Sequence, residues 1–306
     1  MPLTISEVVE PLIVASFIQS LLYGLYIATF SVSLRWLLFN DNEWTIRSRF
    51  NKPMLIISCL IFLLLTTDII ISFQITLATY RRDPVFVTYN TISVAAEGLT
   101  IILVDAVLIF RCFIVYSRQW RVIYIPLAFW LGNIVCTIIF TYWSVLVIQG
   151  PLPDAIPPRL FHISQAFYAC TIATNIYATS AIILRIWGAA KQSCNSDTGD
   201  TLFFSIRIIA ESGLLYTITS IMLLITYVLS PISNTGAIAE LQCSAINFPV
   251  TGIAFNLILI RVAQQRVTSD SRANLTKPIS ALRFRTVSTG TKSSNTFGNE
   301  GVGSLP

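Results

Sequence analysis

Ionisable side chains stand inside stretches of the sequence that are otherwise apolar. The clearest case is the run 91–121, which carries Glu97, Asp105 and Arg111. A charge near the middle of a bilayer costs about 2.5 kcal/mol or more, so it persists only where it faces a protein interior or a water-filled cavity. Asp105 lies near the middle of this run. Other helices must therefore surround it, and the groups that they present determine what it does.

Further polar residues fall at similar depths in the neighbouring apolar segments. Asp68 lies midway along the second segment, Asn175 midway along the fifth, and Asn247 within the seventh. Together with Asp105, these residues predict a shared interior cavity for a ligand or an ion. The alternative is a network of interhelical hydrogen bonds that only holds the bundle together, each worth about 0.6 kcal/mol on average.

The two ends of the third segment raise separate expectations. Arg111 lies toward one end, at a depth similar to that of Glu211 in the sixth segment. The pair predicts a latch at the inner face, which outward movement of the sixth helix would break. The alternative is a local pair between Glu211 and Arg207, four residues apart on one helix face. Glu97, near the outer end, predicts either a ligand contact in an outer vestibule or a salt bridge with the arginines of the preceding loop.

The composition requires a membrane protein. Only 11% of the 306 residues are charged and 54% are hydrophobic, whereas soluble domains are about 25% charged; the mean hydropathy is +0.71. A membrane span needs about 20 apolar residues, and the segments that meet this length are 12–38, 53–79, 92–116, 122–148, 161–187, 205–229 and 237–260. We therefore predict an all-α fold, a seven-transmembrane-helix bundle over residues 1–267. Residues 268–306 are rich in Ser, Thr, Gly and Asn, which predicts a disordered tail.

Basic residues are distributed unequally between the two sides of the predicted bundle. When the N-terminus is placed outside, all of the 20 Lys and Arg residues except Arg81, Arg82 and Arg159 fall on the inner side. Because basic residues accumulate on the cytosolic side of a membrane, we predict that the N-terminus is outside and the C-terminus is cytosolic. In the tail, arginines precede Ser288 at a spacing that basophilic kinases favour, which makes Ser288 a phosphorylation candidate. The alternative is a basic tail that lies along the membrane without regulation.

Several classes of function are excluded by residues that the sequence lacks. The single histidine, His162, excludes the ligand sets of haem cytochromes, membrane desaturases and seven-span zinc hydrolases. All lysines lie outside the predicted spans, which excludes a retinal Schiff base. The sequence has no phosphate-binding Gly-rich loop, no HExxH and no serine-nucleophile elbow. We therefore expect no enzymatic activity, no catalytic residue, no metal, no cofactor and no nucleic-acid partner.

Four motifs along the chain resemble those of a known family. They are Asp105–Leu127 (DAVLIFRCFIVYSRQWRVIYIPL), Thr174–Trp187 (TNIYATSAIILRIW), Glu211–Thr219 (ESGLLYTIT) and Phe248–Ala263 (FPVTGIAFNLILIRVA). In this order they are similar to an uncharacterised family of seven-span integral membrane proteins from mushroom-forming (basidiomycete) fungi. The resemblance covers most of the chain up to Val267. It implies a multi-pass fungal membrane protein in which the charged motif positions are Asp105, Arg111, Arg185, Glu211 and Arg261.

The sequence favours a receptor-like sensor of a small extracellular or membrane-dissolved ligand. The predicted loops are short, and the basic, Ser/Thr-rich tail is available to a cytosolic signalling partner. The main alternative is a proton- or cation-coupled transporter or channel that uses Asp68, Asp105 and Glu211, although the internal repeat of many transporters is not seen. A third alternative is a structural membrane protein without a ligand. Every one of these hypotheses has the lipid bilayer as a partner, in either the plasma membrane or an endomembrane.

Overall fold

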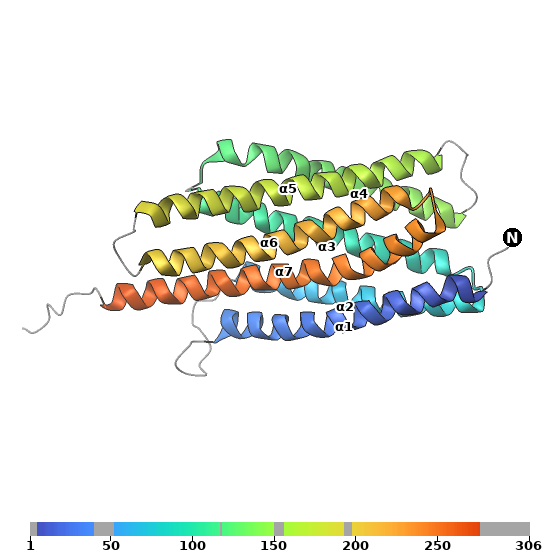
Figure 1. The fold of residues 1–306 in the computed structure, drawn as a ribbon, viewed down its shortest axis with the longest axis horizontal. Helices are drawn as coiled ribbons and strands as arrows, with labels where there is room; N and C mark the ends of the chain where they lie inside the picture. Colours follow the sequence, from blue (N-terminus) through green and yellow to red (C-terminus); the bar gives the residue numbers. More distant parts are fainter. Residues whose placement is uncertain (1–4, 40–51, 117, 150–155, 193–197, 276–306) are drawn as a thin grey trace, which may run out of the picture. The chain divides into compact units, whose positions relative to one another are not determined.

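The protein is a helical bundle. The computed structural model describes residues 5–39, 52–116, 118–149, 156–192 and 198–275. In these ranges the helices are α1 (Ile5–Leu38), α2 (Lys52–Arg81), α3 (Phe86–Val115), the 3-10 turn η1 (Trp120–Val122), α4 (Tyr124–Gln149), α5 (Ile156–Gln192), α6 (Thr198–Leu229) and α7 (Asn234–Leu275). Over residues 1–267, which form one compact unit, the long helices run side by side (Figure 1).

Each of the seven long helices in the described ranges contains a segment long and apolar enough to cross a membrane. These segments are Val9–Leu38, Lys52–Arg81, Phe86–Val115, Tyr124–Leu146, Arg159–Gly188, Ala210–Leu229 and Asn234–Arg261. The prediction of an all-α, seven-span bundle is thereby confirmed, and the chain is a multi-pass integral membrane protein. The orientation of the termini stays a prediction, because it depends on which side of the membrane each end occupies.

Helices α3 and α7 are the most enclosed of the seven. Within their apolar segments, 56% of the α3 window and 72% of the α7 window are buried, against 11% for α4. Helix α3 lies against α2, α4 and α5. Helix α7 packs through the main apolar cluster, in which its Phe255 and Leu259 join Tyr26 of α1 and Leu65 of α2. The side chains of α3 and α7 are therefore those that interior sites must use.

A glycine sets how closely α7 approaches α1 and α2. A Cβ atom placed on Gly252 would lie 2.6 Å from Leu65 Cδ1 and 2.7 Å from Tyr26 Cε2. Neither distance leaves room for a side chain at this position. Small residues at such contacts let membrane helices pack tightly, and packing is the main force between helices in lipid.

The helices agree with the predicted spans, with differences at the ends. Most are longer than predicted, because helices continue beyond the apolar run into polar residues. The largest difference is in α7, which continues past the predicted start of the tail at 268 to Leu275. The rest of the tail, including Ser288, lies outside the described residues, as does the side chain of Arg207.

Candidate functional site

A cavity of about 820 Å³ lies between the helices at one end of the bundle. It is lined by residues of the first half of α1, α3, α5 and α7 and of the second half of α2, α4 and α6. Because successive helices run in opposite directions, these halves lie at the same end. One lining residue from each helix, in order, is Leu12, Ile75, Val94, Phe140, Phe167, Tyr227 and Leu241. By the predicted orientation this is the outer end.

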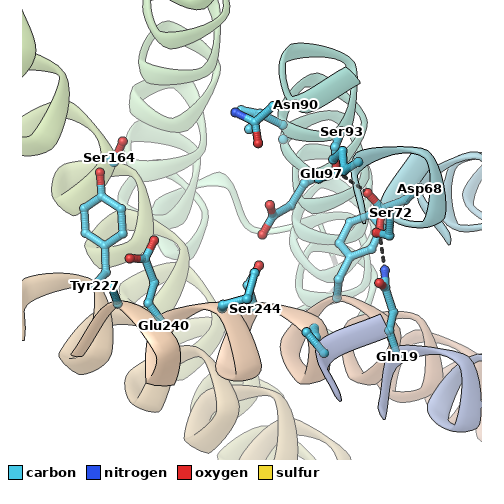
Figure 2. A pocket seen from close by; sticks show the side chains of 18 of the residues that line it. Gln19, Asp68, Ser72, Asn90, Ser93, Glu97, Ser164, Tyr227, Glu240 and Ser244 are labelled. Carbon is cyan, nitrogen blue, oxygen red and sulfur yellow. Dashed lines mark hydrogen bonds between the residues drawn. The ribbon is translucent and has the colours of Figure 1, made fainter. Parts of the chain in front are cut away.

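Asp68 lies in the wall of this cavity and joins three helices. It is buried, and its Oδ2 accepts a hydrogen bond of 2.7 Å from Gln19 Nε2 of α1. Its Oδ1 accepts a hydrogen bond of 2.5 Å from Ser93 Oγ of α3 (Figure 2). Both carboxylate oxygens of Asp68 therefore have donors, so this residue ties α1, α2 and α3 together beside the cavity.

Glu97 also lines the cavity, and its side chain projects between Asp68 and Glu240 (Figure 2). Its Oε1 is buried and has no hydrogen-bond partner among the described residues. Nor does Glu97 form an ion pair with Arg81 or Arg82 within that part of the chain, so the rim salt bridge is absent there. The structure thus places Glu97 in the cavity wall with one buried oxygen that lacks a donor among the described residues.

Glu240 is a third acidic residue of the wall, and the sequence pattern did not single it out. It lies on α7 beside Tyr227 (Figure 2). It falls within the first turn of the predicted seventh span, 237–260, where a charge can reach water at the membrane surface and so gives no sign of an interior site. No lysine, arginine or histidine lines the cavity in the described part of the chain. Its Asp and Glu side chains therefore meet no basic lining residue there.

Asp105 does not line this cavity. It is 0% exposed, and its Oδ2 accepts a hydrogen bond of 3.2 Å from Asn133 Nδ2 of α4. The same amide donates at 2.8 Å to Thr171 Oγ1 of α5. Within the described residues, Asp105 Oδ1 and Asn133 Oδ1 have no hydrogen-bond partner. We call Asp105, Asn133 and Thr171 the enclosed cluster. Asn133 was not picked out from the sequence, although it lies in an apolar span like Asn175 and Asn247, because the pattern does not rank one buried Asn above another.

The two other residues of the predicted cavity form interhelical hydrogen bonds instead. Asn175 of α5 donates through Nδ2 to Thr217 Oγ1 at 2.5 Å and to the carbonyl of Gly213 at 3.2 Å, both on α6. Asn247 of α7 accepts at 3.2 Å from Ser220 of α6. Both asparagines are buried. Of the four predicted cavity residues, the structure therefore brings only Asp68 to the cavity.

At the opposite end of the helices, Arg111 joins α3 to α7. Its Nη1 donates a hydrogen bond of 3.0 Å to the backbone carbonyl of Ile258. Glu211 is exposed, and its charge interacts with that of Arg261 on α7. Arg111 and Glu211 thus both interact with residues of α7. The latch between α3 and α6 stays a prediction.

Comparison with known proteins does not assign the chain to a family. No protein-family model and no curated protein matches the chain. The resemblance to the fungal seven-span family accordingly stays a prediction. Among the residues that the structure describes, no three His, Cys, Asp or Glu side chains converge on a point that could hold a metal ion.

Proposed function

We propose that the chain is a receptor-like sensor that binds a small ligand in this cavity. The observation that carries the proposal is that residues of α1 to α7 all line one space of about 820 Å³. Sites for small molecules in proteins are commonly concave spaces of about 300–1,000 Å³. A ligand in this position contacts every helix at once, so it can favour one arrangement of the bundle over another.

The proposal places the N-terminal end of the bundle outside the membrane, in agreement with the distribution of basic residues. The cavity then opens toward the outside, and Arg111 lies toward the cytosol. Helices α3 and α7 line the cavity at one end and are joined by the hydrogen bond from Arg111 to Ile258 at the other. Movement of α3 relative to α7 on ligand binding would alter this hydrogen bond, which gives the signal a route across the bundle.

The position of the cavity favours sensing over transport. All lining residues belong to the same end of their helices, whereas Asp105 lies among packed side chains. A transporter also needs a second arrangement in which the site opens to the other side. The transporter therefore remains the alternative that an experiment must separate from the sensor.

A thermal-shift screen tests the binding proposal directly. The purified protein in lipid nanodiscs is heated with each member of a library of small molecules, beside two tryptophan variants. Ser244→Trp fills the cavity from α7, and Ser31→Trp places the same side chain on the exposed face of α1. We expect ligands that raise the midpoint temperature of the wild type and of Ser31→Trp and leave Ser244→Trp unchanged. Ligands that act equally on both variants, or no ligand at all, would contradict a site in this cavity.

A flux assay separates the sensor from the transporter. Liposomes that contain the protein and a pH-sensitive dye are exposed to imposed proton and cation gradients. We expect no flux above that of empty liposomes. A flux that is lost in Asp105→Asn, while the variant keeps the thermal stability of the wild type, would make the chain a transporter or channel.

A further inference from the structure

We propose that the ligand is an elongated organic cation with two or more separated amine groups, a polyamine, held between Glu97 and Glu240. This inference rests on the proposed binding function and adds the chemical class of the ligand.

The acidic side chains of the cavity favour a positively charged ligand. Asp68, Glu97 and Glu240 line it, and within the described residues no basic side chain does. Like charges in a space with apolar walls repel each other more strongly than in water. A cleft that carries charges of one sign concentrates ligands of the opposite sign. A cation is therefore the ligand that relieves this repulsion.

Glu97 has a buried acceptor without a donor among the described residues. The oxygens of Asp68 already accept from Gln19 and Ser93, so Asp68 contributes charge rather than a free acceptor. Glu97 Oε1 is buried without a partner in the part of the chain that the structure describes. A buried acceptor without a donor costs free energy. An ammonium group carries three donors and no acceptor, and so supplies the donor that Glu97 lacks once its carboxylate turns toward the ligand.

The carboxylates of the cavity do not converge on one point. In Figure 2, Asp68 and Glu240 lie on opposite sides of Glu97, and no three acidic groups among the described residues converge on a metal-sized point. Because metal–oxygen distances are only about 2.0–2.6 Å, a compact ion needs ligands that converge on one point, and these carboxylates do not form such a group. A chain with amines at intervals can contact Glu97 and Glu240 together within a cavity of about 820 Å³.

Aromatic rings beside Glu240 support an ammonium group at that position. Tyr227 lies next to Glu240 (Figure 2), and the rings of Tyr168 and Tyr227, which both line the cavity, have centroids 5.8 Å apart. The face of an aromatic ring attracts a cation within about 6 Å. The same rings provide apolar surface for the methylene groups between two amines.

A lipid headgroup that carries an ammonium group is the alternative ligand with the same positively charged group. In phospholipids the ammonium stands a few atoms from a phosphate. That phosphate would enter a cavity with carboxylates and no basic lining residue among those described, where the charges repel. The cavity therefore fits a free polyamine better than a phospholipid.

The test uses amines of matched length on the full chain in nanodiscs of phosphatidylcholine. Thermal shift and isothermal titration calorimetry are measured with 1,4-diaminobutane and spermidine, beside butylamine, 1,4-butanediol and Mg²⁺. The variants are Glu97→Gln and Glu240→Gln. The matched control is Glu10→Gln, which removes an exposed carboxylate at the same end of α1 that does not line the cavity.

We expect spermidine and the diamine to bind, butylamine to bind more weakly and the diol not to bind. Glu97→Gln and Glu240→Gln should each weaken the binding of spermidine by about ten- to hundredfold, and Glu10→Gln should leave it unchanged. Equal binding of butylamine, equal stabilisation by Mg²⁺, or full affinity in both cavity variants would overturn the inference. The inference would also be overturned if phosphatidylethanolamine in the nanodisc abolished the binding of spermidine.

The two proposals fail in different ways. If the amines do not bind, and neutral compounds from the library stabilise the wild type but not Ser244→Trp, the polyamine inference is overturned and the cavity remains a ligand site. If neither amines nor library compounds distinguish Ser244→Trp from Ser31→Trp, both proposals are overturned.

Discussion

Helix α3 carries two carboxylates in contrasting surroundings, Glu97 and Asp105, separated by about 12 Å along the helix axis at a rise of about 1.5 Å per residue. Glu97 lies in the wall of a large cavity with one oxygen unpaired among the described residues. Asp105 is fully enclosed and accepts a hydrogen bond from Asn133. The neighbouring helices, rather than the residue type, decide whether such a carboxylate borders open space or is enclosed by packed side chains.

The difference follows from the side chains that the other helices supply at each level. Around the enclosed cluster, Asn133 and Thr171 bring polar atoms into direct contact with one another and with Asp105. Around the cavity, α1 and α7 supply small residues such as Ala15 and Ser244, which leave space unfilled. A ligand needs unfilled space, whereas the stability of the bundle depends on contact between side chains. The following predictions test this contrast.

Asn133→Leu should have the largest effect on stability. The substitution removes the donor to Asp105 and leaves a fully buried acidic side chain without that hydrogen bond, at a cost of about 3 kcal/mol in the free energy of unfolding. Unfolding by titration with a denaturing detergent measures the loss. Ile138→Leu, at an exposed position on the same helix, is the control and should change nothing. A loss below about 1 kcal/mol would mean that Asp105 is held by other groups.

Asp68→Ala should cost less, because Asp68 lies beside the cavity, where water can reach the groups that it releases. Gln19 and Ser93 both lose their acceptor, and we expect a loss of about 2 kcal/mol in the free energy of unfolding. Asp68→Asn keeps one acceptor and should lose about half as much. The same denaturation experiment measures both variants. Equal losses in the two would show that the charge, rather than the hydrogen bonds, holds the three helices.

Glu97→Gln should change stability in the opposite direction. In the absence of ligand it replaces a carboxyl group whose charged form is disfavoured by burial and by the neighbouring Asp68 and Glu240, and we expect a gain of about 1 kcal/mol in the free energy of unfolding. Thermal unfolding of the ligand-free protein measures the gain, with Glu10→Gln as a control that should not change. A loss of stability would place Glu97 with Asp105 as a structural carboxylate, and the contrast between the two regions would not hold.

Asn175→Ala should have the smallest effect. Hydrogen bonds between membrane helices contribute about 0.6 kcal/mol on average, and Asn175 makes its contacts to α6 away from the cavity. We expect a loss of about this size in detergent titration and no change in the affinity for a cavity ligand. A change in affinity at constant stability would instead connect Asn175 to the ligand site.

Residue types and spacing predicted part of the site. Asp68 and Glu97 were singled out because an ionisable group inside an apolar run must face something other than lipid, and both line the cavity. Asp105 was chosen for the same reason. An ionisable group in an apolar run, however, does not show whether its face of the helix borders a cavity or packed side chains. Glu240 was missed because a charge near the end of a span has an alternative partner in water. Asn133 was missed although Asn175, another uncharged residue in a span, was chosen, because the sequence does not show which of these amides faces a carboxylate.

The sequence by itself determined the architecture: the apolar runs are long enough to cross a bilayer, and lipid permits such a run only as a hydrogen-bonded helix. It also determined that some polar groups must turn inward. Only the tertiary structure decided which of them share a space. The rotation of each helix about its axis and its offset along its neighbours depend on side-chain packing between segments far apart in the sequence, such as Gly252 against Leu65 and Tyr26. That packing leaves a cavity at Glu97 and fills the bundle at Asp105.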